Sequence, residues 1–339
     1  MYRSRLLLFG VILSIFLSII TVGAQFQYIY TSFGPKYIIK EDYDRHLSRI
    51  SGIAAAPLRY RVLTDYVLGK VMKLFPAQDN QERARIYEKV AFGFRIGQNI
   101  IIFLLALFYF RSLKLSFQFS FIGMILCAYG MCFAFVQSDL SYYIYTQIAF
   151  FLLAATLINF QKYNWLIPLT IIAAFNREEA IFIPLMLLGC QIIHFNFKIF
   201  DKRTVLLQAS QLIFCFGSYF LIYFGLRYVL GSAGYSISRY GMVFPGLELF
   251  RLNFLNPDTW IGLSLMYSGL PFIILYFRKW PAILKSYLIC LVLPWFMLEF
   301  AFGSSDETRL FLVPLFIVFV PATIFMLSNL NPEMQKNKV

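Results

Sequence analysis

Charged residues are scarce in this sequence: they make up 14% of its 339 residues, against 60% hydrophobic residues. Soluble globular domains carry about 25% charged and about 45–50% apolar residues. So much apolar surface cannot be hidden in one aqueous core. The composition therefore excludes a soluble enzyme, a disordered chain and a fibrous protein, and it predicts an all-α polytopic membrane protein.

Cysteines and nucleic-acid motifs are also few. All five cysteines lie in apolar runs, where a thiol behaves as a small hydrophobic group, so they provide neither a disulfide framework nor a metal site. Basic residues outnumber acidic ones by 30 to 17, but no basic helix, Gly-rich RNA motif or zinc-finger spacing accompanies them. We therefore expect no nucleic-acid partner and interpret the excess as the charge that orients the chain in a membrane.

Long apolar runs predict about ten transmembrane helices, because a helix needs about 20 mostly apolar residues to cross about 30 Å of hydrocarbon. One run, Trp165–Ile193, is too long for a single helix and contains Asn176-Arg177-Glu178-Glu179. We expect two short helices there, Trp165–Phe175 and Ala180–His194, with the charges at an outer surface or in a wet cavity. Eight plainer spans complete the count: Leu6–Ala24, Val90–Phe110, Phe117–Val136, Ile144–Phe160, Leu207–Leu226, Trp260–Phe277, Ser286–Glu299 and Leu310–Leu327. The span Val90–Phe110 has Arg95 near its start, so we expect its outer turn at the interface.

The short loops predict how these spans are oriented. With Arg3 and Arg5 in the cytoplasm, the other loops on that side carry mainly lysine and arginine, which is the positive-inside pattern. We therefore expect a single transmembrane domain over residues 1–339, in a bacterial inner or plasma membrane, with both termini cytoplasmic. A cleaved signal peptide over residues 1–24 stays open, because a basic start and an apolar core precede small residues there.

Residues 25–88 form a long polar stretch that this orientation places outside the cytoplasm. Its acidic run includes Asp42 and Asp44, for which a solvated acidic turn is the alternative to a site. Apolar residues at helical spacing from Leu58 onward predict an amphipathic helix on the membrane surface, flanked by Lys70 and Lys73. The loop thus combines carboxylates with an interfacial helix.

Three short patterns carry a resemblance to a known family. They are Asp42-Tyr43-Asp44 soon after the first span, the basic and aromatic segment Pro57–Arg61, and the pair Arg177-Glu178 that interrupts a middle span. Together with the multispanning layout, they resemble the GT-C superfamily of integral-membrane glycosyltransferases. The acceptor-binding signatures of that family are absent, so the acceptor stays open.

The resemblance implies transfer of a sugar from a polyprenyl-phosphate donor to a hydroxyl of a glycan, lipid or protein acceptor. The reaction, part of building a cell envelope glycan, takes place on the extracytoplasmic face with inversion. A carboxylate must take the hydroxyl proton and cations must stabilise the leaving phosphate. The resemblance implies Asp44, and next Asp42, as the base. For the donor phosphate, the resemblance implies Arg59, Arg61, Arg177 and Arg309. Further candidates beside them are His46, Glu178, Glu179 and Glu307. A divalent Mg or Mn ion at the two aspartates stays open.

Other interpretations of the same residues stay open. Arg59 and Arg61 would also suit lipid headgroups, Arg177 a local pair with Glu178 or Glu179, and the loop at Asp306–Arg309 an ordinary turn. Asp139 is a weaker candidate, and Glu299 is expected to be a partner for one of the arginines. A broken charged helix also favours a transporter or a lipid-linked glycan flippase, although no second half repeats the pattern. A glycan polymerase and a structural membrane subunit are the remaining alternatives.

Overall fold

The computed structural model describes residues 2–34, 36–134, 141–194, 202–231, 246–303, 305 and 307–330, and every regular element in these ranges is helical. Asp139 and Asp306 lie outside the described residues. The absence of strands there confirms the all-α class. The elements, with short 3-10 and π segments marked η, are as follows: α1 (Tyr2–Phe33), η1 (Ile38–Asp42), α2 (Tyr43–Ile50), η2 (Leu58–Tyr60), α3 (Val62–Met72), α4 (Asn80–Ser112), α5 (Phe117–Phe133), α6 (Tyr142–Asn159), η3 (Tyr163–Trp165), α7 (Leu166–Ala174), η4 (Glu178–Ile181), α8 (Phe182–His194), α9 (Lys202–Leu230), α10 (Leu247–Leu255), α11 (Pro257–Tyr267), η5 (Leu270–Lys279), α12 (Ala282–Tyr287), η6 (Leu288–Val292), α13 (Leu293–Phe302), η7 (Thr308–Phe311), α14 (Leu312–Pro314), η8 (Leu315–Phe319) and α15 (Val320–Leu330).

Six helical stretches of the described chain are long and apolar enough to cross a membrane, which agrees with an integral membrane protein. A bent pair, α11 with η5, would make a seventh if its halves, inclined by 64°, form one span. The predicted count of about ten also includes α5 and the two halves of the broken span, and it stays a prediction. The six stretches are Ser4–Phe33, Asn80–Ser112, Tyr142–Asn159, Leu206–Leu230, Ala282–Phe302 and Thr308–Leu330.

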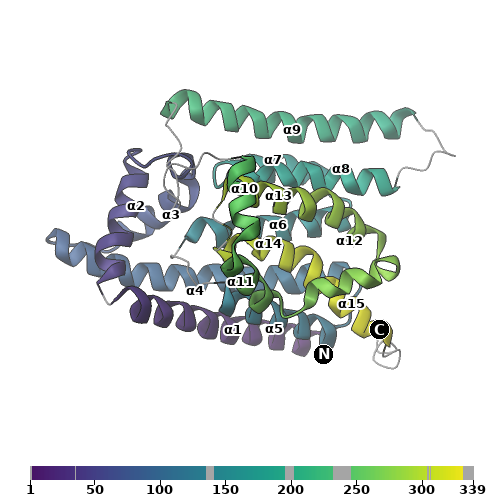
Figure 1. The fold of residues 1–339 in the computed structure, drawn as a ribbon, viewed down its shortest axis with the longest axis horizontal. Coiled ribbons are helices and arrows are strands. Elements are labelled where there is room, and N and C mark those ends of the chain that lie inside the picture. The colour runs from purple at the N-terminus through teal and green to yellow at the C-terminus, as the bar shows by residue number, and fades with distance from the viewer. Residues whose placement is uncertain are drawn as a thin grey trace.

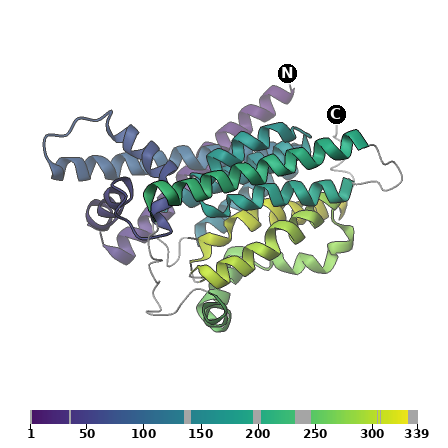
Figure 2. The ribbon, with the colours of Figure 1, turned by 90° about the horizontal axis from the view of Figure 1, so that it is seen from above.

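The long helices lie side by side and form a bundle, with α9 along one side and α1 along the opposite side (Figure 1). Helices α2 and α3 lie at one end of this bundle, whereas both chain ends lie toward the other end (Figures 1 and 2). We call residues 36–79, which carry α2 and α3, the loop lobe. The first loop and the termini are therefore at opposite ends of the bundle.

Helices extend into the predicted first loop from both sides. Helix α1 continues through the aromatic run Phe26–Phe33, so it ends well beyond Ala24. Helix α4 begins at Asn80 because Asp79 caps it: the Asp79 carboxylate accepts a hydrogen bond from the Glu82 amide at 2.6 Å. Glu82 in turn accepts from the Gln78 amide at 2.7 Å, much as in a capping box. The non-spanning part of the loop is thus shorter than residues 25–88.

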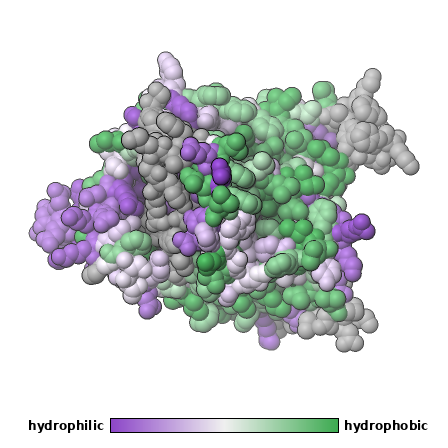
Figure 3. Space-filling model, in the orientation of Figure 1, coloured by the Kyte–Doolittle hydropathy of each residue, from purple (hydrophilic) through white to green (hydrophobic). Residues whose placement is uncertain are grey.

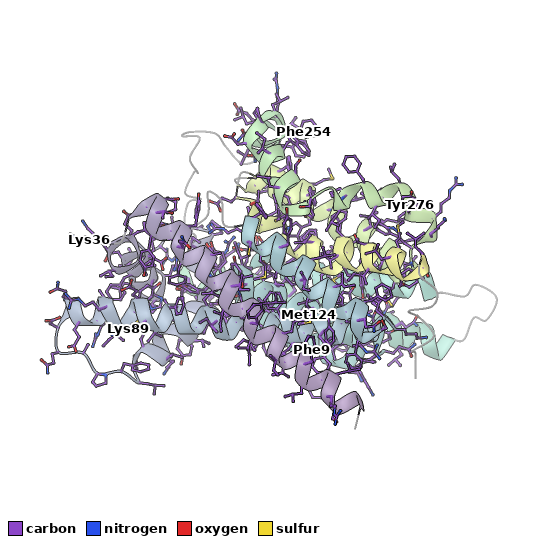
Figure 4. The ribbon with its side chains drawn as sticks, turned by 90° about the horizontal axis from the view of Figure 1, so that it is seen from below. Phe9, Lys36, Lys89, Met124, Phe254 and Tyr276 are labelled. Atoms are coloured by element: carbon purple, nitrogen blue, oxygen red, sulfur yellow. The ribbon has the colours of Figure 1, made fainter. Side chains whose placement is uncertain are left out.

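The surface reflects this division between bundle and loop lobe. In Figure 3, hydrophobic residues cover most of the visible middle of the bundle, and hydrophilic residues gather at the loop-lobe end. Lys36 and Lys89 lie at that end, while Phe9 and Met124 lie along the bundle (Figure 4). Phe9 is about half exposed and Met124 is fully buried. An apolar outer surface of this kind suits contact with lipid.

Candidate functional site

The middle span is broken, as predicted, between α7 and η4. Helix α7 ends at Ala174, and the Asn176 side chain ties the turn that follows to two other elements. Its Nδ2 donates to the Tyr143 carbonyl on α6 at 2.7 Å, and its Oδ1 accepts from the Thr64 hydroxyl on α3 at 2.6 Å. The Leu63 amide donates to the Phe175 carbonyl at 3.1 Å. The loop lobe therefore docks directly onto the break.

Arg177 follows this turn and is almost fully buried, at 2% exposure. Its Nε donates to Glu179 Oε2 at 2.8 Å and its Nη2 to Glu179 Oε1, which makes a bidentate pair. Nη2 also lies 3.4 Å from Glu299 Oε1 near the end of α13. The local pair that the sequence left open as an alternative for Arg177 is therefore present, and Glu299 is the partner of an arginine, as expected.

Arg61 brings the loop lobe into the same group of charges. Its Nε donates to Glu178 Oε2 at 3.2 Å, its Nη2 lies 4.0 Å from Glu179 Oε1, and its guanidinium covers the Tyr143 ring at 4.9 Å. Burial lowers the pKa of Arg61, but the carboxylates of Glu178 and Glu179 raise it more, so the net pKa lies above the ordinary value. Arg61 is therefore a permanent buried cation.

Arg227 near the end of α9 completes the group and is a residue that the sequence analysis missed. Its Nη2 lies 3.9 Å from Glu178 Oε1, and its guanidinium covers the rings of Tyr60 at 4.4 Å and Tyr223 at 3.5 Å. It follows directly after the predicted span that ends at Leu226, where a cation is normally assigned to the interface. We call the following six residues the arginine–glutamate cluster: Arg61, Arg177, Glu178, Glu179, Arg227 and Glu299.

Buried arginine atoms in this region retain donor capacity. Arg177 Nη1 and the Nε of the half-buried Arg59 make no hydrogen bond within the described part of the chain. Buried donors are normally paired, so such atoms call for an anion or a water. Both residues were predicted to bind the donor phosphate, and the structure brings Arg177 together with Arg61 in the cluster.

Arg309 and Glu307 lie at the start of the last span. Arg309 is buried, and its Nη2 donates to Glu307 Oε2 at 2.7 Å. The turn before them is fixed by Asn253 of α10, whose Nδ2 donates to the carbonyls of Phe300 and Gly303, each at 2.8 Å. Glu307 and Glu299 interact electrostatically, so this pair lies at the border of the cluster.

Arg95, which the sequence places near the start of a span, is fully buried in the middle of α4. Its guanidinium covers the rings of Tyr145 at 3.6 Å and Tyr142 at 4.6 Å. Two tyrosine faces stabilise a cation away from water. Helix α4 begins at Asn80, ten residues before the predicted span, so Arg95 lies in the helix interior, and its position relative to the membrane interface stays a prediction. Its signal was a charge inside an apolar run, which usually faces a bundle interior.

Asp42 and His46 belong to a second group, within the loop lobe and the start of α4. Asp42 is buried and accepts from the Tyr87 hydroxyl at 2.6 Å. His46 Nδ1 lies 2.9 Å from Asp65 Oδ1, and Arg49 Nε lies 2.8 Å from Asp65 Oδ2. Burial lowers the pKa of Arg49, but Asp65 and Asp42 raise it above its ordinary value. We call these five residues the aspartate–histidine network. Arg49, Asp65 and Tyr87 were not predicted from the sequence.

Asp44 lies apart from both groups and is exposed on α2. It is two positions from the buried Asp42 on continuous helical backbone, so the two carboxylates point to different sides. This arrangement does not suit one metal ion held by both aspartates. Within the described ranges no three His, Cys, Asp or Glu side chains are grouped closely enough to hold a metal.

Comparison of the chain with protein-family models, curated proteins and solved structures gives no match. The site therefore has to be interpreted from its own geometry. That geometry brings together Arg61, Arg177, Glu178 and Glu179, and it places Arg309 with Glu307 beside them. Asp42 and His46 belong to a neighbouring group. Asp44 stands alone.

Proposed function

We propose that the chain is a GT-C-type membrane glycosyltransferase, which moves a sugar from a polyprenyl-phosphate donor to an acceptor hydroxyl. The observation that carries the proposal is the convergence of Arg61, Arg177 and Glu299 at one end of a membrane bundle. They come from the first loop, the broken span and the end of a late helix. A site for a lipid-borne anion at a membrane boundary needs such a group of buried cations.

The reaction breaks the bond between the anomeric carbon and the phosphate oxygen, and a new bond forms from that carbon to the acceptor oxygen with inversion. The acceptor proton passes to a carboxylate. The polyprenyl phosphate leaves with its negative charge, which Arg59, Arg61 and Arg177 stabilise by charge-assisted hydrogen bonds. The buried donors of Arg59 and Arg177 that lack a partner in the described structure support this assignment.

We propose Asp44 as the base. It lies apart from the arginine–glutamate cluster, so this role requires α2 to approach the cluster when donor and acceptor bind. Asp44 is exposed, so an acceptor can reach its carboxylate, whereas Asp42 is buried and engaged by Tyr87. The loop lobe would then lie on the extracytoplasmic face of a bacterial inner or plasma membrane and both termini in the cytoplasm. The position of the loop lobe at the bundle end opposite the termini supports this topology (Figure 1).

The test is incubation of membranes containing the full chain with a panel of labelled polyprenyl-phosphate sugars. We expect transfer of label from one donor to a membrane acceptor, and its loss in Asp44→Asn and in Arg61→Gln. Glu41→Gln is the matched control, because Glu41 is an exposed acid three positions from Asp44 and is expected to keep full transfer.

The outcomes separate the proposal from its rival. Turnover that survives Asp44→Asn would remove this residue as the base. Movement of the labelled donor across the bilayer without any new glycosidic bond would instead favour a flippase, for which the broken span is also suitable.

A further inference from the structure

A pocket of about 520 Å³ lies in the loop lobe, between α2, α3 and the first turns of α4. This volume is within the range of sites that hold small molecules or headgroups. The pocket is lined by none of the arginine–glutamate cluster. Apolar side chains form much of its wall, among them Leu47, Ile50, Met72 and Phe75.

The charged groups of this pocket are of one sign. Lys70, Lys73 and Arg83 line it, and no aspartate or glutamate is among its lining residues. All three cations are exposed, and the Lys70 ammonium also covers the Tyr66 ring at 5.1 Å. A wall with three cations and no carboxylate favours an anionic group.

His46 provides one polar side chain of the pocket. Its Nδ1 lies 2.9 Å from Asp65 Oδ1, in a carboxylate that also pairs with Arg49, so in the neutral imidazole Nδ1 donates its hydrogen to that carboxylate. Nε2 then carries a lone pair, and it makes no hydrogen bond to any residue within the described ranges. A Cβ placed on Gly69 would lie 3.8 Å from Nε2, in van der Waals contact, so Gly69 packs directly beside this atom. Nε2 is therefore an acceptor suited to a hydroxyl.

The apolar wall continues out of the pocket. Leu47, Ile50 and Phe75 line it and are nonetheless 45%, 51% and 52% exposed, and the neighbouring Leu74 is 75% exposed. In a membrane protein such side chains suit hydrocarbon next to a headgroup. The combination of cations, one hydroxyl acceptor and an apolar exit matches a lipid rather than a free anion.

We propose that this pocket binds the headgroup of an anionic lipid that carries a free hydroxyl. Lys70, Lys73 and Arg83 pair with its phosphate, Nε2 of His46 accepts from its hydroxyl, and its acyl chains lie along Leu47, Ile50 and Phe75. The site is separate from the arginine–glutamate cluster and does not depend on the proposed sugar transfer.

The test uses the purified full chain in a neutral detergent and measures lipid binding by native mass spectrometry. Phosphatidylglycerol is compared with phosphatidylmethanol, which has the same charge but no headgroup hydroxyl, with phosphatidylcholine and with inorganic phosphate. We expect phosphatidylglycerol to bind about tenfold more tightly than phosphatidylmethanol, which corresponds to one hydrogen bond. Phosphatidylcholine and inorganic phosphate are expected to bind more weakly still.

Charge variants test the same site. Lys70→Gln with Lys73→Gln is expected to weaken phosphatidylglycerol binding about tenfold, since each exposed charge pair contributes modestly and two of them are lost together. Lys36→Gln with Lys89→Gln is the matched control. These lysines are exposed at the same end of the molecule but do not line the pocket (Figure 4).

A second measurement needs no change in the pocket. The chain has two histidines, so a nitrogen spectrum of histidine-labelled protein has two side chains to assign, and His194→Gln identifies His46. We expect Nδ1 of His46 to be protonated and its Nε2 signal to move with phosphatidylglycerol but not with phosphatidylmethanol. Equal binding of the two lipids, binding of phosphate alone with equal strength, or equal losses in the two double variants would overturn the proposal.

Discussion

The two charged groups at the loop-lobe end are built from the chain in different ways. The arginine–glutamate cluster joins residues far apart in sequence: Arg61 and Glu178 are separated by 117 positions, and Arg177 and Glu299 by 122. The aspartate–histidine network draws four of its five members, Asp42 to Asp65, from one continuous segment. The first group holds helices together, whereas the second gives the loop lobe its own shape.

This difference predicts how damage should spread. A buried ion pair that loses one partner leaves an uncompensated charge, and the cost is felt by every element that the pair connected. In the cluster those elements are the loop lobe, the broken span, α9 and α13. In the network they are α2, α3 and the start of α4. Substitutions in the cluster should therefore have global effects, and those in the network local ones.

The largest effect is expected for Arg177→Met. Glu179 and Glu299 would stay buried without their main cation, so the free energy of unfolding should fall by about 3–5 kcal/mol. The measurement is denaturant-induced unfolding in detergent micelles. Arg278→Met, at an exposed position of η5, is the control and should leave stability within about 0.5 kcal/mol.

A second substitution sharpens this test. Adding Glu299→Gln to Arg177→Met removes one of the two orphaned carboxylates and should restore part of the loss. If Glu299→Gln lowered the free energy of unfolding as much in the Arg177→Met background as it does in the wild type, the two residues would not be coupled. The 3.4 Å contact between them would then carry no energy.

A smaller and local effect is expected for Asp65→Asn. The neutral amide cannot compensate Arg49 and holds His46 less firmly, so the loss should be about 2–3 kcal/mol. Hydrogen exchange should increase within residues 36–79 and the first turns of α4, while the rest of the bundle stays protected. Asp258→Asn on the exposed side of α11 is the control. Increased exchange throughout the bundle would contradict the local role of the network.

The same contrast explains what the sequence could and could not predict. Charges inside an apolar run predicted the broken span and offered a local pair of Arg177 as one alternative, because both depend on neighbours in sequence. The partners of Arg61 and Arg227 depend on how distant helices pack, and no local pattern records that. Arg95 was placed near the start of its span because the Asp79 cap that begins α4 lies upstream of the apolar run.

The candidate site was predictable to the same extent. Arg177, Glu178 and Glu179 were identified because they interrupt an apolar segment, where an ionisable group is costly without a function or a partner. Arg227 was missed because it follows an apolar span, where a cation is ordinary. Asp65 was missed because it lies in a polar loop, where a carboxylate is unremarkable. Its importance comes from burial beneath His46 and Arg49, which only the tertiary arrangement creates.

The smallest effect is expected at the joint between the two groups. Thr64 precedes Asp65 of the network and donates its hydroxyl hydrogen to Asn176 Oδ1, in the turn before Arg177. Thr64→Val keeps the shape of the side chain but leaves that buried oxygen without its donor, so stability should fall by about 1–2 kcal/mol. Thr31→Val at an exposed position of α1 is the control.

The informative quantity is the coupling of Thr64→Val to the other two substitutions. If the hydroxyl connects the groups, its effect should be smaller in the Arg177→Met background and in the Asp65→Asn background than in the wild type, because each already loosens one side of the joint. Strict additivity in both backgrounds would mean that the two groups are energetically independent. The turn after α7 would then be held without help from the Thr64 hydroxyl, by contacts such as the 2.7 Å hydrogen bond between Asn176 and the Tyr143 carbonyl.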